Sequence, residues 1–183
     1  MSFFMKKEIE TLESKLVYSN RWMTVCEDKV LRLSGQEGIY GVVHKPDFAV
    51  IAAVQGDYIY LVEQYRYPVA GRYWELPQGS WEKSDISPLA LATAELREET
   101  GLVACSMEHL GHLFLAYGYS DQGYDVFYAT DLRQSSSDTD PEEEGLVAQK
   151  FSIAEVEQMI VDGRIKDATT VAALGLLKLK GRL

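Results

Sequence analysis

The apolar run from Phe48 to Val54, FAVIAAV, constrains the fold of this chain most strongly. It is far too short to cross a lipid bilayer, which takes about 20 apolar residues, so a soluble protein is expected. Because polar residues do not alternate within it, the run predicts a strand that is buried on both faces. The turn signal Gly56-Asp57 separates it from YIYLVEQYR, residues 58–66, so the two stretches are expected to form a hairpin.

One central helix and two C-terminal helices complete the expected pattern. The central helix is predicted to begin with Ser87 as N-cap and Pro88 at its first position, and to end at Gly101. Strands followed by helices in this order predict an α/β sandwich. The other expected strands fall within 15–33, 38–44, 108–118, 124–132 and 146–152, and the C-terminal helices over 153–161 and 169–180.

Composition and charge limit the classes of function. With 183 residues, 46% of them hydrophobic, the chain is expected to form one globular domain with a small elaboration. A formal net charge of −10 argues against a broad nucleic-acid-binding surface, and it implies that an anionic small ligand would need a metal cation beside it. Two isolated cysteines, Cys26 and Cys105, suit a reducing compartment, so a cytoplasmic protein without a membrane or nucleic-acid partner is expected.

The most informative motif is AELREETGL, residues 94–102, which places three glutamates near the end of the central helix. Glu95, Glu98 and Glu99 are spaced i, i+3 and i+4, so all three share one helix face. Like charges at this spacing cost about 0.2–0.5 kcal/mol per pair, and they also oppose the helix dipole. A solvated acidic face is one interpretation; a Mg²⁺ site completed by substrate phosphates is the other. A backbone carbonyl of the loop LPQG could be a further oxygen ligand of the metal, and the carbonyl of Gln78 is the expected one.

The stretch from Gly79 to Leu102, GSWEKSDISPLALATAELREETGL, resembles the Nudix box. The resemblance implies hydrolysis of a nucleoside diphosphate linked to another moiety, with Glu95, Glu98 and Glu99 holding a divalent metal, Mg²⁺ or alternatively Mn²⁺. It also implies a Nudix-type α/β/α sandwich with a mixed sheet and a small N-terminal β subdomain.

Two positions depart from the Nudix pattern. The family's arginine falls on Ala94 and its upstream glutamate on Ile86, while Gly79 lies one residue too far from the helix. Joint loss of both members of an ion pair need not destabilise a fold, so an active site with an altered loop is expected. The rival interpretation is a catalytically silent module that binds a nucleotide.

Further segments resemble the ADP-ribose pyrophosphatase branch of this family. They are VEQYRYPV, WELPQG, GYDVFYATDL and GRIKDATTVAAL, in this order along the chain. The branch implies that residues 1–45 exchange contacts in a homodimer and that residues 46–183 form the catalytic domain. It also implies nucleoside diphosphate sugar substrates, above all ADP-ribose, hydrolysed to AMP and ribose 5-phosphate.

The resemblance also suggests a base and substrate contacts. In the branch a glutamate on the mobile acidic loop approaches the attacking water, and Glu144 aligns best, with Glu142 and Glu143 close behind; a solvated acidic loop is the alternative. Substrate contacts are assigned to Arg66, Trp74, Glu75 and Tyr119. Two of them have a structural alternative: Arg66 suits a strand-end salt bridge, and Trp74 suits the core.

Overall fold

The computed structural model describes residues 7–80, 86–135 and 145–183. It divides the chain into two compact units. The first contains Met1–Pro46 and Phe114–Gly123, and the second contains Asp47–Leu113 and Tyr124–Leu183.

The first unit is built on a three-stranded antiparallel sheet with the strand order β1-β2-β3. Its strands are β1 (Ile9–Ser19), β2 (Thr24–Arg32) and β3 (Glu37–His44). The side chain of Asn20 shapes the turn after β1, because its oxygen accepts the backbone N–H groups of Trp22 and Met23, each at 2.9 Å. Every residue of β1 after Ile9 is exposed, so this sheet contributes little to a buried core.

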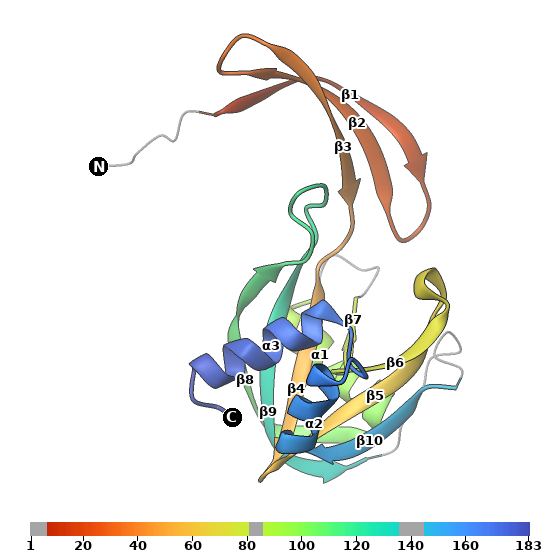
Figure 1. Cartoon of the computed structure of the whole chain (residues 1–183), viewed down its shortest axis with the longest axis vertical. Helices are drawn as coiled ribbons and strands as arrows, with labels where there is room; N and C mark the ends of the chain where they lie inside the picture. Colours follow the sequence, from red (N-terminus) through yellow and green to blue (C-terminus); the bar gives the residue numbers. More distant parts are fainter. Residues whose placement is uncertain (1–6, 81–85, 136–144) are drawn as a thin grey trace. The chain divides into compact units, whose positions relative to one another are not determined.

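The second unit contains a seven-stranded mixed sheet (Figure 1). Its main path runs β10-β5-β4-β9-β8, with β6 paired to β5 and β7 paired to β4. β4 pairs in parallel with β9 and antiparallel with β5, which confirms the predicted mixed sheet. The strands are β4 (Phe48–Gln55), β5 (Tyr58–Arg66), β6 (Gly71–Glu75), β7 (Gln78–Gly79), β8 (Leu102–Phe114), β9 (Gly123–Gln134) and β10 (Val147–Ser152).

The central strand β4 is buried on both faces, as its composition predicts. Residues 49–53 have no exposed area, and their side chains alternate between two apolar clusters. The pairs Val54↔Ile59 and Gln55↔Tyr58 close the expected hairpin around Gly56, whose φ of 60° is one that glycine adopts readily.

Three α-helices cover the two faces of this sheet: α1 (Pro88–Thr100), α2 (Ile153–Val161) and α3 (Ala168–Leu179). α1 packs on the face that holds Ala49 and Ile51, whereas α2 and α3 pack on the face that holds Val50 and Ala52 (Figure 1). The predicted α/β/α sandwich is confirmed. Among residues 7–80, 86–135 and 145–183, no helix is both long and apolar enough to span a membrane.

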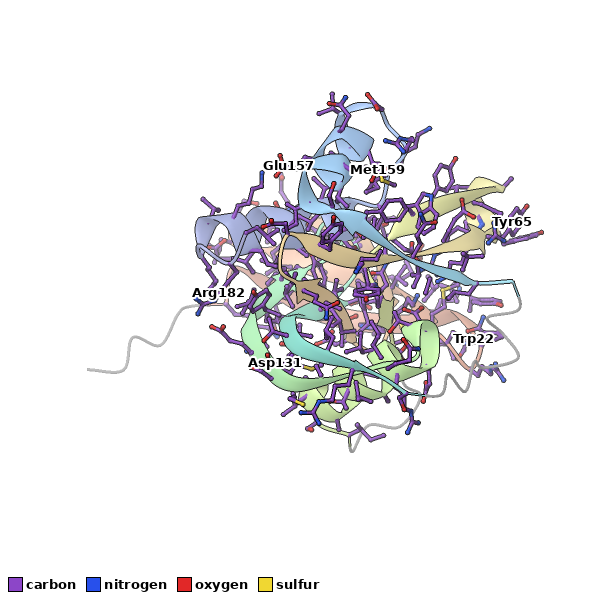
Figure 2. All side chains as sticks on the ribbon, turned by 90° about the horizontal axis from the view of Figure 1, so that it is seen from below. Trp22, Tyr65, Asp131, Glu157, Met159 and Arg182 are labelled. Carbon is purple, nitrogen blue, oxygen red and sulfur yellow. The ribbon has the colours of Figure 1, made fainter. Side chains whose placement is uncertain are left out.

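The ends of α1 and α3 follow from their capping residues. Ser87 accepts the N–H of Ala90 at 3.2 Å, and Gly101 ends α1 in the left-handed conformation with φ 69°, as expected. α3 begins with Asp167 as N-cap. Near the C-terminus, Arg182, which is labelled in Figure 2, follows α3. Its guanidinium donates two hydrogen bonds to Glu108 of β8, at 2.9 and 3.0 Å.

Candidate active site

The three glutamates of α1 differ in their environment. Glu95 is 6% exposed and Glu99 is 3% exposed, whereas Glu98 is half-buried and lies 3.6 Å from the guanidinium of Arg97. The interpretation of the three glutamates as a solvated acidic face therefore applies to Glu98 at most. Burying an ionised carboxylate is costly unless it is hydrogen-bonded or paired, so Glu95 and Glu99 require specific surroundings.

Glu99 is held by groups from two strands. Its Oε2 accepts the backbone N–H of Gln78 in β7 at 2.8 Å, and its Oε1 accepts the side-chain amide of Gln64 in β5 at 3.5 Å. The loop that carries Gln78 thus folds against the carboxylate face, as the sequence suggested. The observed contact uses the Gln78 N–H, however, and the role of its carbonyl as a metal ligand stays a prediction.

Glu95 lies directly against the backbone of Gly79. A methyl group added at Gly79 would overlap with the Glu95 carboxylate. A larger residue at this position would therefore have to push the Glu95 carboxylate aside, a constraint that the Nudix resemblance alone did not explain.

A third buried carboxylate faces this helix from the sheet. Glu75, at the end of β6, is 2% exposed; it pairs with the Arg66 guanidinium and accepts the Gln64 amide at 3.0 Å. Burial raises the pKa of the Glu75 carboxyl above its ordinary value, although Arg66 opposes this effect. Gln64 therefore bridges Glu75 and Glu99 with one amide nitrogen.

The residues fit a hard divalent cation by their chemistry. Carboxylates from α1 are the ligands that Mg²⁺ prefers, and the close packing of Gly79 on Glu95 leaves their oxygens beside a backbone loop. Within the described part of the chain, no three His, Cys, Asp or Glu side chains already converge as a metal cage. Glu99 accepts hydrogen bonds from Gln78 and Gln64, and Glu98 lies near Arg97.

Arg66 and Glu75 form an ion pair at the end of β5, which matches the structural alternative for Arg66. Its side chain is 40% exposed, however, so the guanidinium also reaches solvent. Trp74 packs edge-on against Phe151, with ring centroids 4.8 Å apart, on the side of the sheet that α2 and α3 cover. This is the core position that was the alternative for Trp74, and a substrate contact for it stays a prediction.

The other predicted residues belong to the first unit or lie outside the described residues. Tyr119 belongs to the first unit, where its side chain is 60% exposed and its carbonyl accepts the N–H of Val43 at 2.8 Å. Glu142, Glu143 and Glu144 lie outside the described residues.

Both departures from the Nudix pattern are apolar residues, and one of them contacts the apolar core. Ile86 packs against the cluster that contains Leu91, Leu96 and Phe127, on the face of the sheet that α1 covers. This contact is the kind of apolar replacement that was expected for the missing ion pair. Ala94 is half-buried on α1.

Sequence reasoning missed Gln64, Asp167 and Thr170, which together tie β5, β7 and α3 to the site. Gln64 and Arg66 are two residues apart on a strand, so the alternation rule could have placed both on one face. The sequence Asp-Ala-Thr-Thr could have indicated an N-cap. The residues that these three contact are distant in sequence, so no local pattern could have predicted the contacts.

Family models match nearly the whole chain. The NUDIX domain model matches residues 43–174, and a model described as the nucleoside diphosphate sugar hydrolase N-terminal domain matches residues 9–43. The chain therefore belongs to the Nudix family, and it is a member of the ADP-ribose pyrophosphatase-like branch that its motifs predicted. The prediction of a Nudix pyrophosphatase is confirmed at the level of this family.

The chain is similar to several individual proteins. The ADP-ribose pyrophosphatase of Mycobacterium tuberculosis is 30% identical over 169 residues, which cover 91% of this chain and 82% of the relative. The methanol dehydrogenase activator of Bacillus methanolicus is 31% identical over 178 residues, which cover 96% of both chains. The crystal structure of an ADP compounds hydrolase superposes with a TM-score of 0.85 at 23% identity, covering 97% of this chain and 98% of that chain, and supports the fold.

Proposed function

We propose that the protein is a Mg²⁺-dependent hydrolase of the diphosphate bond in nucleoside diphosphate sugars, with ADP-ribose as the leading substrate and AMP and ribose 5-phosphate as products. The observation that carries the proposal is the pair of buried carboxylates, Glu95 and Glu99, on one face of α1 beside the loop of Gly79. The similarity to a relative named ADP-ribose pyrophosphatase supports the choice of substrate.

Each residue has a defined part in this proposal. Glu95, Glu98 and Glu99, with the Gln78 carbonyl, would hold the divalent metal, which can be Mg²⁺ or Mn²⁺. When bound, such an ion neutralises phosphate charge and makes a coordinated water more acidic. Arg66, partly exposed while paired with Glu75, binds a phosphate oxygen. Trp74, Glu75 and Tyr119 remain proposed contacts to the substrate.

The acidic loop supplies the proposed base. Glu144, or its neighbours Glu142 and Glu143, would take the proton of the attacking water. The described residue that follows them, Gly145, is fixed: its carbonyl accepts a hydrogen bond of 2.6 Å from Arg72 of β6. This contact ties one end of the acidic loop to the strand that also carries Glu75.

A substrate panel tests the activity directly. Purified protein is incubated with ADP-ribose, ADP-glucose, UDP-glucose, GDP-mannose and NAD, each with Mg²⁺, and release of nucleoside monophosphate is followed by chromatography. NAD is included because it contains an ADP-ribose moiety. Turnover that is fastest with ADP-ribose and absent with excess chelator is expected. Binding of these compounds without turnover of any would instead favour a catalytically silent module, which the missing arginine at Ala94 also suggests.

A homodimer is proposed from the three-stranded sheet, and residues 1–45 are the proposed contact segment. The pairing register places Leu16, Cys26 and Val42 in one row, with Asp28 and Tyr40 on the same face. Leu16 and Tyr40 are 60% and 41% exposed. Among the described residues, Asp28 Oδ1 is buried without a hydrogen-bond partner.

Sedimentation analysis of the wild type and of Leu16→Ser tests this dimer. A dimeric wild type and a shift of Leu16→Ser toward monomer are expected, because the substitution removes apolar area from the proposed contact. Leu179→Ser is the matched control, since Leu179 is also exposed but lies on α3.

A cytoplasmic location is also proposed. The free cysteines, Cys26 and Cys105, support it, because free thiols suit a reducing compartment.

A further inference from the structure

Asp167 makes more contacts than the N-cap of a helix needs. Its Oδ1 accepts the N–H of Thr169 at 3.3 Å, and its Oδ2 accepts the N–H of Thr170 at 2.8 Å. These two bonds cap α3. The same Oδ2 also accepts the Thr170 hydroxyl at 2.7 Å and the Gln78 side-chain amide at 3.2 Å, and the second of these contacts reaches outside the helix.

Thr170 extends this contact to the strand connection before β7. Its hydroxyl accepts the backbone N–H of Leu76 at 2.9 Å, and both Thr170 and Leu76 have no exposed area. Because a backbone N–H can only donate, the hydroxyl hydrogen is free to point toward Asp167. The first turn of α3 therefore holds residues 76–78 at two points, through the Leu76 backbone and through the Gln78 side chain.

Residue 78 is also the one whose backbone N–H meets Glu99 Oε2 at 2.8 Å. We propose that Asp167, together with Thr170, is a positioning residue: it fixes the segment 76–78 so that the Gln78 N–H orients the Glu99 carboxylate on α1. Asp167 touches none of the α1 glutamates in this chain of contacts and acts through Gln78. The consequence for metal binding and turnover rests on the proposed function, whereas the consequence for Gln78 does not.

Matched variants separate this role from simple capping. Asp167→Ser keeps an N-cap oxygen for α3 but is too short to reach the Gln78 side chain, while Asp167→Asn keeps an acceptor oxygen of the original length. Thr170→Val removes the acceptor of the Leu76 N–H and keeps the side-chain shape, while Thr170→Ser keeps the hydroxyl. We call these two contacts, Asp167 with the Gln78 side chain and Thr170 with the Leu76 N–H, the clamp. Asp167→Ser loses the first contact and Thr170→Val loses the second, whereas the two controls retain both.

Hydrogen exchange of the Gln78 backbone amide in metal-free protein, followed by NMR, is the direct readout. The amide is expected to exchange about tenfold or more faster in Asp167→Ser and Thr170→Val than in the wild type, with the two controls close to the wild type. The amide of Phe127, in the core strand β9, should keep its rate in all four variants. Gln78→Ala is expected to accelerate exchange at residue 78 similarly, and adding Asp167→Ser to it should change nothing further.

The results decide the proposal whether or not the protein hydrolyses nucleotide sugars. Unchanged exchange at Gln78 in both clamp-deficient variants would overturn it, and so would an equal acceleration at Gln78 and Phe127, which would indicate general destabilisation. If the wild type turns over ADP-ribose, both variants should also need a higher Mg²⁺ concentration for half-maximal rate. Absence of turnover in the wild type would contradict the proposed function. The hydrogen-exchange rates at Gln78 would still test the clamp, because they do not depend on turnover.

Discussion

The two units of this protein bury their side chains very differently. Among the described residues, Val30 is the buried hydrophobic residue of the first unit, whereas the second unit contains two apolar clusters on either side of β4. The polar contacts differ in the same way. Lys29 and Glu13 form an exposed pair in the first unit, while Arg66 and the buried Glu75 pair in the second. Backbone pairing and exposed polar contacts shape the first sheet, whereas packing on both faces of β4 stabilises the second unit.

The difference in burial indicates which unit can hold a buried and oriented carboxylate. A carboxylate needs a rigid surrounding if it is to remain buried and oriented, and α1 has one because Leu96 and Leu91 anchor it to the sheet. The first unit has exposed apolar side chains instead, which suits contact with another chain. The site therefore depends on the second unit, and the proposed dimer depends on the first.

Truncation of a buried leucine should show the largest difference between the units. Leu96 has no exposed area, so Leu96→Ala should lower the free energy of unfolding by about 2–5 kcal/mol. Leu16 is 60% exposed, and Leu16→Ala in dilute protein should change it by less than about 0.5 kcal/mol. Urea denaturation measures both values, and comparable losses would contradict the contrast.

Gly79 offers the next largest effect. The methyl group of Gly79→Ala would overlap with the Glu95 carboxylate, so the substitution should displace a proposed metal ligand and reduce kcat/KM about 100-fold. Gly175→Ala is the control, because a methyl group at that position of α3 meets no atom within 4 Å. Alanine in the helix should instead add about 0.5–1 kcal/mol of stability. Equal activity in the two variants would mean that Glu95 is not held by Gly79.

The glutamates of α1 should differ in stability when metal is absent. Their spacing alone predicts that removing any of these charges stabilises the helix, but Glu99 accepts the Gln78 N–H. Glu99→Ala should therefore cost about 1–3 kcal/mol in the free energy of unfolding. Glu98→Ala should stay within about 0.5 kcal/mol, since Glu98 is half-buried beside Arg97. Thermal unfolding in chelator provides the comparison, and a stabilised Glu99→Ala would contradict the hydrogen bond.

The pH dependence of stability should show the smallest effect. Burial raises the pKa of Glu75 above its ordinary value of 4.5, so the folded state binds more protons than the unfolded state just above that pH. The stability contributed by this protonation is complete below pH 4.5 and is lost as the pH rises through the folded-state pKa. Glu75→Gln cannot titrate and should lack this decline, while Glu155→Gln, an exposed change on α2, should keep it. Identical slopes in wild type and Glu75→Gln would show that the Glu75 pKa is not raised.

The architecture followed from local signals in the sequence. The unbroken apolar run of β4, the turn at Gly56 and the caps at Ser87 and Gly101 each act through neighbouring residues, so pattern and propensity were sufficient to predict them. The glutamate face of α1 was predicted for the same reason, because the spacing of three residues determines a helix face.

The surroundings of the site could not be predicted in this way. Gln64 meets Glu99 across 35 positions of sequence, and Gln78 meets Asp167 across 89. Such contacts arise only after β5, β7, α1 and α3 have packed. Burial of Glu95 and Glu99 has the same origin, which is why spacing alone suggested that both charges are destabilising.

The rate of ADP-ribose hydrolysis by Glu99→Gln, with Mg²⁺ present, tests the central claim most directly. Glutamine keeps an acceptor for the Gln78 N–H, so the fold should be retained, while the negative charge that the metal needs is removed. A loss of about 100-fold or more in kcat relative to wild type is expected. Glu155→Gln, which changes a glutamate remote from α1 in sequence, should keep the wild-type rate. A near-normal kcat in a folded Glu99→Gln would contradict the assignment of the α1 carboxylates as the centre of catalysis.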